Sequence, residues 1–192
     1  MQTVNLKHAY RLLNHGPTVL VGSAHAGRSN VMAAAWAMPL DFDTPKVAVV
    51  IDKSTLTREL IDASGVLSLC VPTVAMKDRV MAAGGMSGKN HPDKLNRCKI
   101  STQAAPQTGA PLVDGSIAQM ECRVLPATAH VAGPHDLILA EVVGAWADAR
   151  VFSQGRWHFE QAPPELRSLH HVAGGHFYAI GEPVSALPVA NA

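Results

Sequence analysis

Short apolar runs of strand type recur along the first third of the chain. Thr18–Gly22 is apolar and rich in β-branched residues, and Val47–Ile51 (VAVVI) is the strongest strand signal, with Pro45 before it and Asp52 after it. Val66–Val71 has the same character. Each run is too short for a helix, so the pattern predicts buried β-strands at these positions.

Two helices are predicted between and after these strands. Ser54 or Thr55 is a suitable N-cap for a helix that ends at Gly65. Thr73 is placed to cap a second helix that runs through Ala83 and stops at the following glycines. The chain therefore contains two strand-to-helix passages.

The second half of the chain predicts antiparallel strands. Residues 86–114 show no periodicity, and a loop of that length within a small domain is typically functional. Residues 116–125 then alternate between apolar and polar, a turn follows at 133–136, and 137–146 return as the next strand. Because no crossover helix separates these two strands, they are expected to pair antiparallel. A further strand is expected at 177–180.

Taken together, these elements predict a mainly β protein with peripheral helices, in the form of a barrel rather than a doubly wound sheet. The 192 residues are 47% apolar, which is enough to bury one sizeable core. We expect a single domain over residues 1–192, with its core at roughly 17–182.

Composition limits the classes of partner and compartment. With 16 basic and 15 acidic side chains the net charge is +1, so we expect no nucleic-acid partner. Three cysteines without a C-x-x-C pair favour a reducing, cytoplasmic location, and the absence of a long apolar run predicts no membrane partner. No metal site is expected, because the spacing of His170, His171 and His176 matches no zinc pattern.

The stretch from Thr18 to Trp36 has two incompatible interpretations. Gly22, Gly27 and Arg28-Ser29 have the spacing of a phosphate-binding loop, except that arginine replaces the lysine. Alternatively, two strands, Thr18–Ala24 and Asn30–Trp36, are joined by a turn at residues 25–27. Propensity does not decide, since the alanines at 33–35 are good helix formers.

Five blocks in order resemble the flavin reductase-like family, the FMN-binding split barrels that include flavoredoxin. They are Asn30–Trp36 with the VAVVID strand, Ser54–Thr57 with residues 61–71, Gly85–Lys89 with Asp93-Lys94, Glu121-Cys122 with residues 133–141, and His170–Tyr178. The resemblance covers roughly residues 17 to 182. It favours the interpretation of Thr18–Trp36 as two strands.

The resemblance implies a six-stranded antiparallel split β-barrel that forms a homodimer and binds FMN near the subunit interface. The strand of short side chains would carry the isoalloxazine ring, and two groups of donors would hold the phosphate. The implied cofactor-binding residues are Asn30, Val31, Met32, Ala33, Ala34 and Trp36 along the strand, Lys53, Ser54, Thr55 and Thr57 at the helix start, and Ser87, Gly88, Lys89 and Lys94 in the loop.

The resemblance also implies the reaction. No G-x-G-x-x-G loop follows a strand, so NADH or NADPH would stack transiently over the flavin and reduce it. His135, at the turn between two strands, is the candidate catalytic residue, with Pro134 where the family has aspartate. The expected function is an NAD(P)H:flavin reductase that passes electrons to a flavin-dependent monooxygenase or another acceptor. The alternative is a flavin-binding electron carrier or sensor without nicotinamide turnover.

Overall fold

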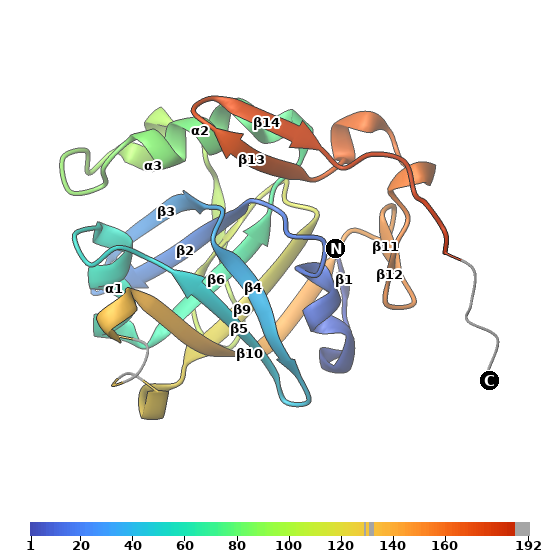
Figure 1. Ribbon diagram of the computed structural model, residues 1–192. Coiled ribbons are helices and arrows are strands. Elements are labelled where there is room, and N and C mark those ends of the chain that lie inside the picture. Colours follow the sequence, from blue (N-terminus) through green and yellow to red (C-terminus); the bar gives the residue numbers. More distant parts are fainter. Residues whose placement is uncertain (129, 131–132, 187–192) are drawn as a thin grey trace.

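The computed structural model describes residues 1–128, 130 and 133–186 and shows one curled antiparallel sheet with helices outside it (Figure 1). The sheet has eight strands: β1 (Gln2–Thr3), β2 (Val19–His25), β3 (Arg28–Ala34), β4 (Ala37–Phe42), β5 (Pro45–Val50), β6 (Val66–Val71), β9 (Ala118–Val124) and β10 (Leu137–Ala147). The expectation of a mainly β protein with peripheral helices is confirmed.

The order of strands explains the curl of the sheet. It runs β3-β2-β6-β9-β10-β5-β4, with β1 added beside β10. The two ends of this path, β3 and β4, are consecutive in sequence and separated only by Ala35 and Trp36. The expected number of six strands differs from the eight observed, because the chain bends between β3 and β4 and because the two-residue β1 pairs with β10.

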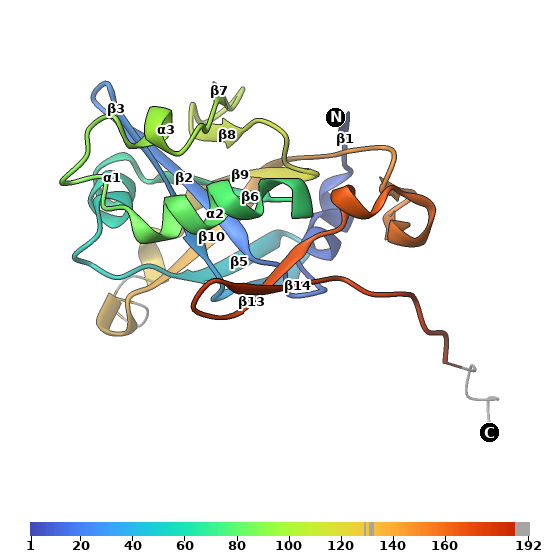
Figure 2. The same cartoon turned by 90° about the horizontal axis from the view of Figure 1, so that it is seen from above.

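Helices and hairpins surround this sheet (Figure 2). The helical segments are η1 (Leu6–Leu12), α1 (Leu56–Ser64), η2 (Val74–Met76), α2 (Lys77–Gly85), α3 (Lys94–Arg97), η3 (Pro126–Thr128), η4 (Gly133–His135), η5 (Phe159–Gln161) and η6 (Pro164–Leu166). The hairpins outside the sheet are β7 (Thr102–Ala104) with β8 (Pro111–Val113), β11 (Phe152–Ser153) with β12 (Arg156–Trp157), and β13 (Leu169–Ala173) with β14 (His176–Ala179).

The hairpin of β2 and β3 excludes the phosphate-loop interpretation. These strands pair antiparallel in continuous register from Val19↔Ala34 to His25↔Arg28. The intervening Ala26 and Gly27 both have positive φ, 48° and 78°, as a tight two-residue hairpin turn requires. The alanines of β3 therefore lie in a strand, because pairing with β2 and packing override their helix propensity.

Helix α1 begins and ends where the pattern predicts. The Thr55 side chain accepts a hydrogen bond from the backbone N–H of Arg58, and Gly65 ends the helix with φ of 70°. The second helix differs from its prediction. Thr73 precedes the short η2 turn and makes no side-chain cap, so α2 begins only at Lys77.

The long stretch 86–114 is not the structureless loop that the absence of periodicity predicted. It contains α3 and the β7–β8 hairpin. These elements have four, three and three residues, which is too short to produce a repeating apolar pattern. Near the end of the described chain, the strand predicted at 177–180 corresponds to β14 (His176–Ala179). Its partner β13 (Leu169–Ala173) is not predicted by the sequence pattern.

The barrel interior is filled by one apolar cluster, and a second cluster lies between the sheet and the elements that cover it. Val21, Val49 and Met120 belong to the first cluster, whereas Leu20 and Val31 belong to the second. Adjacent strand residues thus point to opposite faces of β2. Cys70, Cys98 and Cys122 are free and buried.

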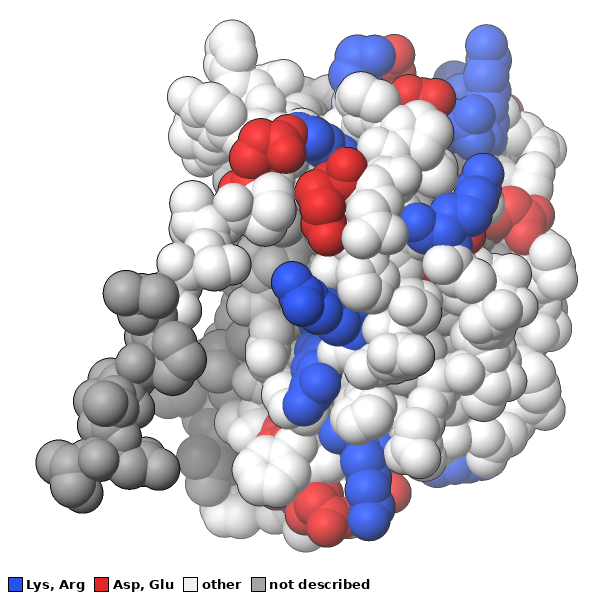
Figure 3. Space-filling model, turned by 90° about the vertical axis from the view of Figure 1, so that its right-hand side faces the viewer, with Lys and Arg blue, Asp and Glu red and all other residues white. Residues whose placement is uncertain are grey.

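The surface carries charge of both signs. On the face shown in Figure 3, basic and acidic side chains both occur, and much of the face is uncharged. In the part of the chain that the structure describes, no helix has the length and apolar character that a membrane crossing requires.

Candidate functional site

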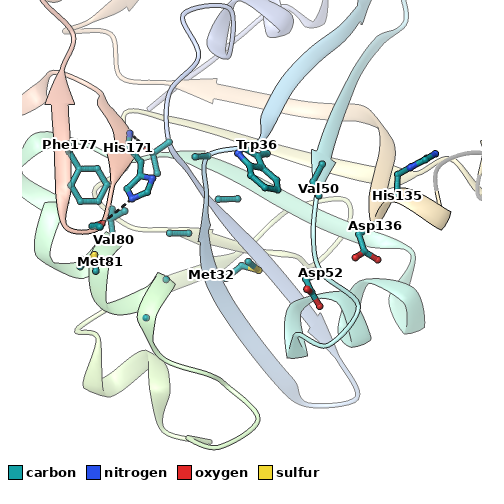
Figure 4. A pocket seen from close by; sticks show the side chains of 17 residues that line it. Met32, Trp36, Val50, Asp52, Val80, Met81, His135, Asp136, His171 and Phe177 are labelled. Atoms are coloured by element: carbon teal, nitrogen blue, oxygen red, sulfur yellow. Dashed lines mark hydrogen bonds between the residues drawn. The ribbon is translucent and has the colours of Figure 1, made fainter.

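A cavity of about 680 Å³ lies between β3, helix α2, the β13–β14 hairpin and the turn before β10 (Figure 4). Its volume is in the range of small-molecule and cofactor sites. In Figure 4, His171 and Phe177 lie at one side and His135 at the other, with Trp36 between them. The lining residues are Thr18, Met32, Ala33, Ala34, Ala35, Trp36, Val50, Asp52, Val80, Met81, Gly84, Gly85, His135, Asp136, His171, Gly174 and Phe177.

Strand β3 supplies the floor of this cavity. The side chains of Ala33, Ala34 and Ala35 are short, so a flat molecule can lie close to the backbone there. Because β3 ends the strand order and pairs, among the described residues, only with β2, its other edge has no sheet partner in this part of the chain. The Val31 side chain, by contrast, is fully buried in the second core cluster, so only its backbone is available to a ligand.

A second cavity of about 410 Å³ follows the first along β3. It is more polar, and the basic side chains of Arg28, Lys89 and Lys94 line it together with Asn30 and Gly88. The full set of lining residues is Gly27, Arg28, Ser29, Asn30, Leu56, Gly88, Lys89, His91, Pro92, Asp93, Lys94, Leu95 and Asn96. The charged lining residues of the first cavity, Asp52 and Asp136, are acidic, so an anionic group is favoured in the second cavity.

Lys94 is the most unusual residue of the second cavity. Its exposed fraction is only 3%, and burial lowers the pKa of its ammonium group. Among the ion pairs of the described residues none includes Lys94, and the neighbouring Asp93 pairs with Arg97 at 2.8 Å. A buried cation without an anionic partner is costly, so this position is suited to an anionic ligand.

The loop before α3 approaches β3 closely. A Cβ atom at Gly88 would lie 2.7 Å from the Asn30 Oδ1, so a glycine is required for this contact. Ser87 is exposed beside it, and its side chain accepts a hydrogen bond from the Lys89 backbone. Lys89 lies 3.8 Å from Glu59, which also pairs with Arg28 at 2.8 Å.

The predicted donors at the start of α1 lie beside the cavities and are not among their lining residues. Thr57 is fully buried, and its Oγ1 accepts a 2.7 Å hydrogen bond from the Asn30 side chain. Thr55 caps α1, and Ser54 is exposed with its backbone N–H donating to Asp52. Lys53 forms an ion pair with Asp136 at 3.4 Å. The structure thus connects this group to β3 through Asn30.

His135 ends η4 at the rim of the first cavity, where it is exposed. The next residue, Asp136, has a positive φ of 55°, and its carboxylate lies 3.4 Å from Lys53 and 3.7 Å from Arg58. These contacts hold the turn against α1. Hydrogen bonds from Ser54, first from its side chain and then from its backbone, lower the pKa of Asp52, so this rim carries negative charge at neutral pH.

Two walls of the first cavity were not among the predicted site residues. Helix α2 contributes Val80, Met81 and Gly84, and the β13–β14 hairpin contributes His171 and Phe177. The rings of His171 and Phe177 meet edge to face at 5.3 Å. The block His170–Tyr178 was a sequence signal for this region, but its pattern gave no indication of which way the side chains point.

The remaining histidines do not form a metal centre in the described part of the chain. No group of three or more histidine, cysteine, aspartate or glutamate side chains there is arranged to hold a metal ion.

A curled antiparallel sheet with a mostly apolar cavity over short side chains and an adjacent basic pocket defines a class of β-barrel suited to a ring-bearing, anionic cofactor. Comparison with known proteins identifies the family. Residues 11–185 match the flavin reductase like domain, so the chain belongs to the flavin reductase-like family. The predicted fold and family are thereby confirmed.

Three similar proteins illustrate the relationship. A crystal structure from Shewanella baltica OS155, described as an FMN-binding domain of flavin reductases-like enzyme, has a TM-score of 0.92 and 47% identity and covers 96% of each chain. The uncharacterized protein YddH of Escherichia coli (strain K12) is 47% identical over 95% of this chain and 96% of its own length. The FMN reductase (NADH) RutF of Variovorax paradoxus is 27% identical over 82% of this chain and 86% of its own length.

Proposed function

We propose that this protein is an FMN-binding oxidoreductase, an NAD(P)H:flavin reductase that passes electrons from nicotinamide through the flavin to an acceptor. The observation that carries this proposal is the succession of two cavities along β3, one mostly apolar with a floor of short side chains, the next basic with the buried Lys94. FMN has the matching form, since a planar ring system is joined by a ribityl chain to a phosphate. The FMN-binding description of the Shewanella relative supports the same cofactor.

The ring of FMN is placed in the first cavity, over Ala33–Ala35. The unpaired edge of β3 offers backbone N–H and C=O groups to the polar edge of the ring. Met32 and Trp36 flank this floor, and both line the cavity. Bound there, the cofactor would supply hydride and electron transfer, while the chain excludes water and sets the orientation.

The phosphate of FMN is placed in the second cavity. Lys94 would supply the central charge, and Lys89, Ser87 and Gly88 would complete the loop around it. Ser54, Thr55 and Thr57 belong to the start of α1, whose N-terminal N–H groups favour an anion. In this arrangement the bond between Asn30 and Thr57 fixes the position of the two phosphate-binding elements relative to each other.

His135 is proposed to act at the rim of the ring cavity. It is exposed and lies opposite the hairpin wall, so the space between them is where a nicotinamide ring can reach the flavin (Figure 4). A histidine at this position can orient the nicotinamide or hold a proton for the flavin. The name FMN reductase (NADH) of the RutF relative supports a nicotinamide donor. A flavin-dependent monooxygenase is the proposed type of acceptor.

The proposed assembly is a homodimer. Trp36, directly before β4, and Met38, Leu40 and Phe42, which alternate along it, are exposed by 74%, 54%, 47% and 64%. Such an apolar stripe on an edge strand is typical of a surface that another chain covers. Since Trp36 also lines the ring cavity, a second copy on this stripe would cover the cavity as well.

The experiment that tests the function uses the purified protein with added FMN. Flavin binding is measured by the quenching of flavin fluorescence, and turnover by the loss of nicotinamide absorbance with NADH and with NADPH. Absence of FMN binding would contradict the whole proposal. If the protein binds FMN but nicotinamide oxidation does not exceed the protein-free rate, the reductase function is wrong. The alternative function, a flavin-binding electron carrier or sensor, would then be supported.

A further inference from the structure

Two histidines and a serine form a continuous chain of hydrogen bonds behind the cavity wall. The Nε2 atom of His15 lies 3.1 Å from the Oγ of Ser168, which lies 3.2 Å from the Nε2 of His170. The Nδ1 of His170 then lies 3.0 Å from the carbonyl oxygen of Gly16. The chain joins the segment before β2 to the first strand of the β13–β14 hairpin.

The carbonyl of Gly16 determines the direction of every hydrogen bond in this chain. A carbonyl only accepts, so His170 must carry its proton on Nδ1, and its Nε2 must accept from the Ser168 hydroxyl. The Ser168 oxygen is then free to accept from the Nε2–H of His15. Both imidazoles are neutral in this arrangement, and each has one defined tautomer.

The surroundings of His15 favour the neutral form. Its ring meets Trp157 at 5.2 Å and Phe159 at 5.6 Å, and its buried Nδ1 has no hydrogen-bond partner among the residues that the structure describes. Burial, reinforced by His170, lowers the pKa of His15 to about 4, and burial also lowers the pKa of His170. Ser168 has no exposed surface.

Charged groups on the neighbouring elements are engaged with other partners. On η5, Glu160 faces His158, with the two side chains 3.9 Å apart. Beside Ser168, Arg167 pairs with Glu182. On β13, the Nε2 of His171 bonds to the carbonyl of Gly174 at 3.0 Å. The protonation state of the hydrogen-bonded chain is therefore determined by the imidazoles of His15 and His170.

The hairpin held by this chain is a wall of the first cavity. Next to the chain, the backbone N–H of Thr18 donates to Leu169 at 2.8 Å, and that of His171 donates to the Thr18 side chain at 2.9 Å. Thr18, His171 and Phe177 all line the cavity. The anchor and the cavity wall are thus parts of one structure.

We propose that His15, Ser168 and His170 are positioning residues that hold the β13–β14 hairpin against the cavity, and that protonation of His170 releases it. This inference rests on the proposed function only in so far as the cavity is taken to bind FMN. A proton on Nε2 of His170 would meet the hydrogen of the Ser168 hydroxyl. The hydroxyl would then have to turn away from its buried acceptor, which weakens the anchor. Acid should therefore loosen the wall and the ligand behind it.

The first experiment tests the anchor in the protein without FMN. Long-range ¹H–¹⁵N NMR spectra of the imidazole rings at pH 8 are expected to show His170 as the Nδ1–H tautomer and His15 as the Nε2–H tautomer. Amide exchange of residues 169–179, corrected for its intrinsic pH dependence, is expected to accelerate below pH 6.5 relative to that of β9. An Nε2–H tautomer of His170, or a hairpin whose protection does not change with pH, would overturn the inference.

The second experiment uses FMN and a matched pair of variants. For the wild type, the Kd for FMN is expected to rise by up to about tenfold on acidification, because protonation of His170 favours the loosened hairpin over the one that binds FMN. His170→Asn can still donate to Gly16 but does not titrate, so its Kd should lose this pH dependence. His176→Asn, an exposed histidine of the same hairpin, should keep it.

The two experiments separate the possible failures. If the His170→Asn variant keeps the wild-type pH dependence, the positioning role is wrong. If FMN does not bind at any pH, the proposed function fails, and the tautomers and the amide exchange still decide the role of the anchor. If His170→Asn does not fold, Ser168→Ala replaces it in the test. This variant removes the central hydroxyl of the hydrogen-bonded chain and keeps both histidines, so its Kd should likewise lose the pH dependence.

Discussion

The side-chain amide of Asn30 donates a 2.7 Å hydrogen bond to the hydroxyl of Thr57, and both residues are buried, with exposed fractions of 3% and 0%. This bond joins the edge strand β3 to the first turn of α1. It therefore links the floor of the ring cavity to the helix start proposed for the phosphate.

Replacing Thr57 by valine is expected to destabilise the fold and to weaken FMN binding. The change preserves the shape of the side chain but leaves the buried Asn30 amide without its acceptor, which costs about 1–3 kcal/mol. Urea unfolding measures the free energy, and flavin fluorescence measures the Kd. Thr57→Ser keeps the hydroxyl and is the control. A Thr57→Val variant as stable as the wild type, beside a destabilised Thr57→Ser variant, would show that the methyl group, not the hydrogen bond, is important.

Lys94→Met is expected to weaken FMN binding without destabilising the protein alone. A hydrogen bond from a charged group is worth about 1.5–3 kcal/mol, so the Kd should rise by about 10- to 100-fold. Since Lys94 is buried and has no ion-pair partner among the described residues, its removal should leave the free energy of unfolding unchanged or raised.

The control for Lys94 is the exposed Lys77→Met at the start of α2. This variant should bind FMN like the wild type. If the Lys94→Met variant binds FMN with unchanged affinity, the proposal that the phosphate lies in the second cavity is wrong.

Much of the barrel is evident from the sequence, because its central strands are apolar and β-branched. Val47–Ile51 and Val66–Val71 correspond to β5 and β6 within one or two residues. The capping residues Thr55 and Gly65 are equally local signals. By contrast, the strand character of residues 30–34 came from the family resemblance, since their composition favours a helix.

The walls of the site could not be predicted because they depend on contacts between distant segments. His15 and Ser168 are 153 residues apart in the chain, and no local pattern brings them together. The β13 strand is mostly exposed, so it lacks the apolar alternation of a sheet strand. The burial of Lys94 also depends on packing of the loop against β3, which its polar sequence does not indicate.

Acid is expected to destabilise the fold through His15. Its pKa is lowered from 6.5 to about 4 in the folded protein, so between these values the unfolded chain binds more protons. The stabilisation is complete above pH 6.5 and is lost as the pH falls toward 4, by roughly 3 kcal/mol at about 1.4 kcal/mol per pKa unit.

The measurement is urea unfolding at several pH values for the wild type and for His15→Gln, whose side chain does not titrate. The difference between them should grow as the pH rises from 4 to 6.5 and then become constant. His25→Gln, an exposed histidine on β2, is the control and should follow the wild type. Parallel curves for the His15 variant would contradict the assigned burial effect.

His135→Asn is expected to lower turnover more than FMN binding. The residue lies at the rim of the cavity and is exposed, so its replacement removes no core contact. If His135 orients the nicotinamide or holds a proton, kcat should fall by about tenfold or more, toward the usual range for general acid–base groups. Nicotinamide absorbance gives the rate and flavin fluorescence the Kd, with His25→Asn as the control. Unchanged kcat would make His135 an ordinary turn residue.

Leu40→Lys is expected to convert a dimer into monomers. Leu40 lies in the centre of the exposed stripe on β4, between Met38 and Phe42, so a charge there would be buried without a partner if a second copy covers the stripe. Sedimentation velocity at micromolar concentration should show a dimer for the wild type and a monomer for the variant. Because Trp36 joins this stripe to the ring cavity, the monomer should also bind FMN more weakly.

Val184→Lys is the control for Leu40→Lys. It changes another exposed apolar residue, 97% accessible and distant in sequence, and should remain dimeric. A monomeric wild type that binds FMN with full affinity would contradict the homodimer and would show that one chain completes the site.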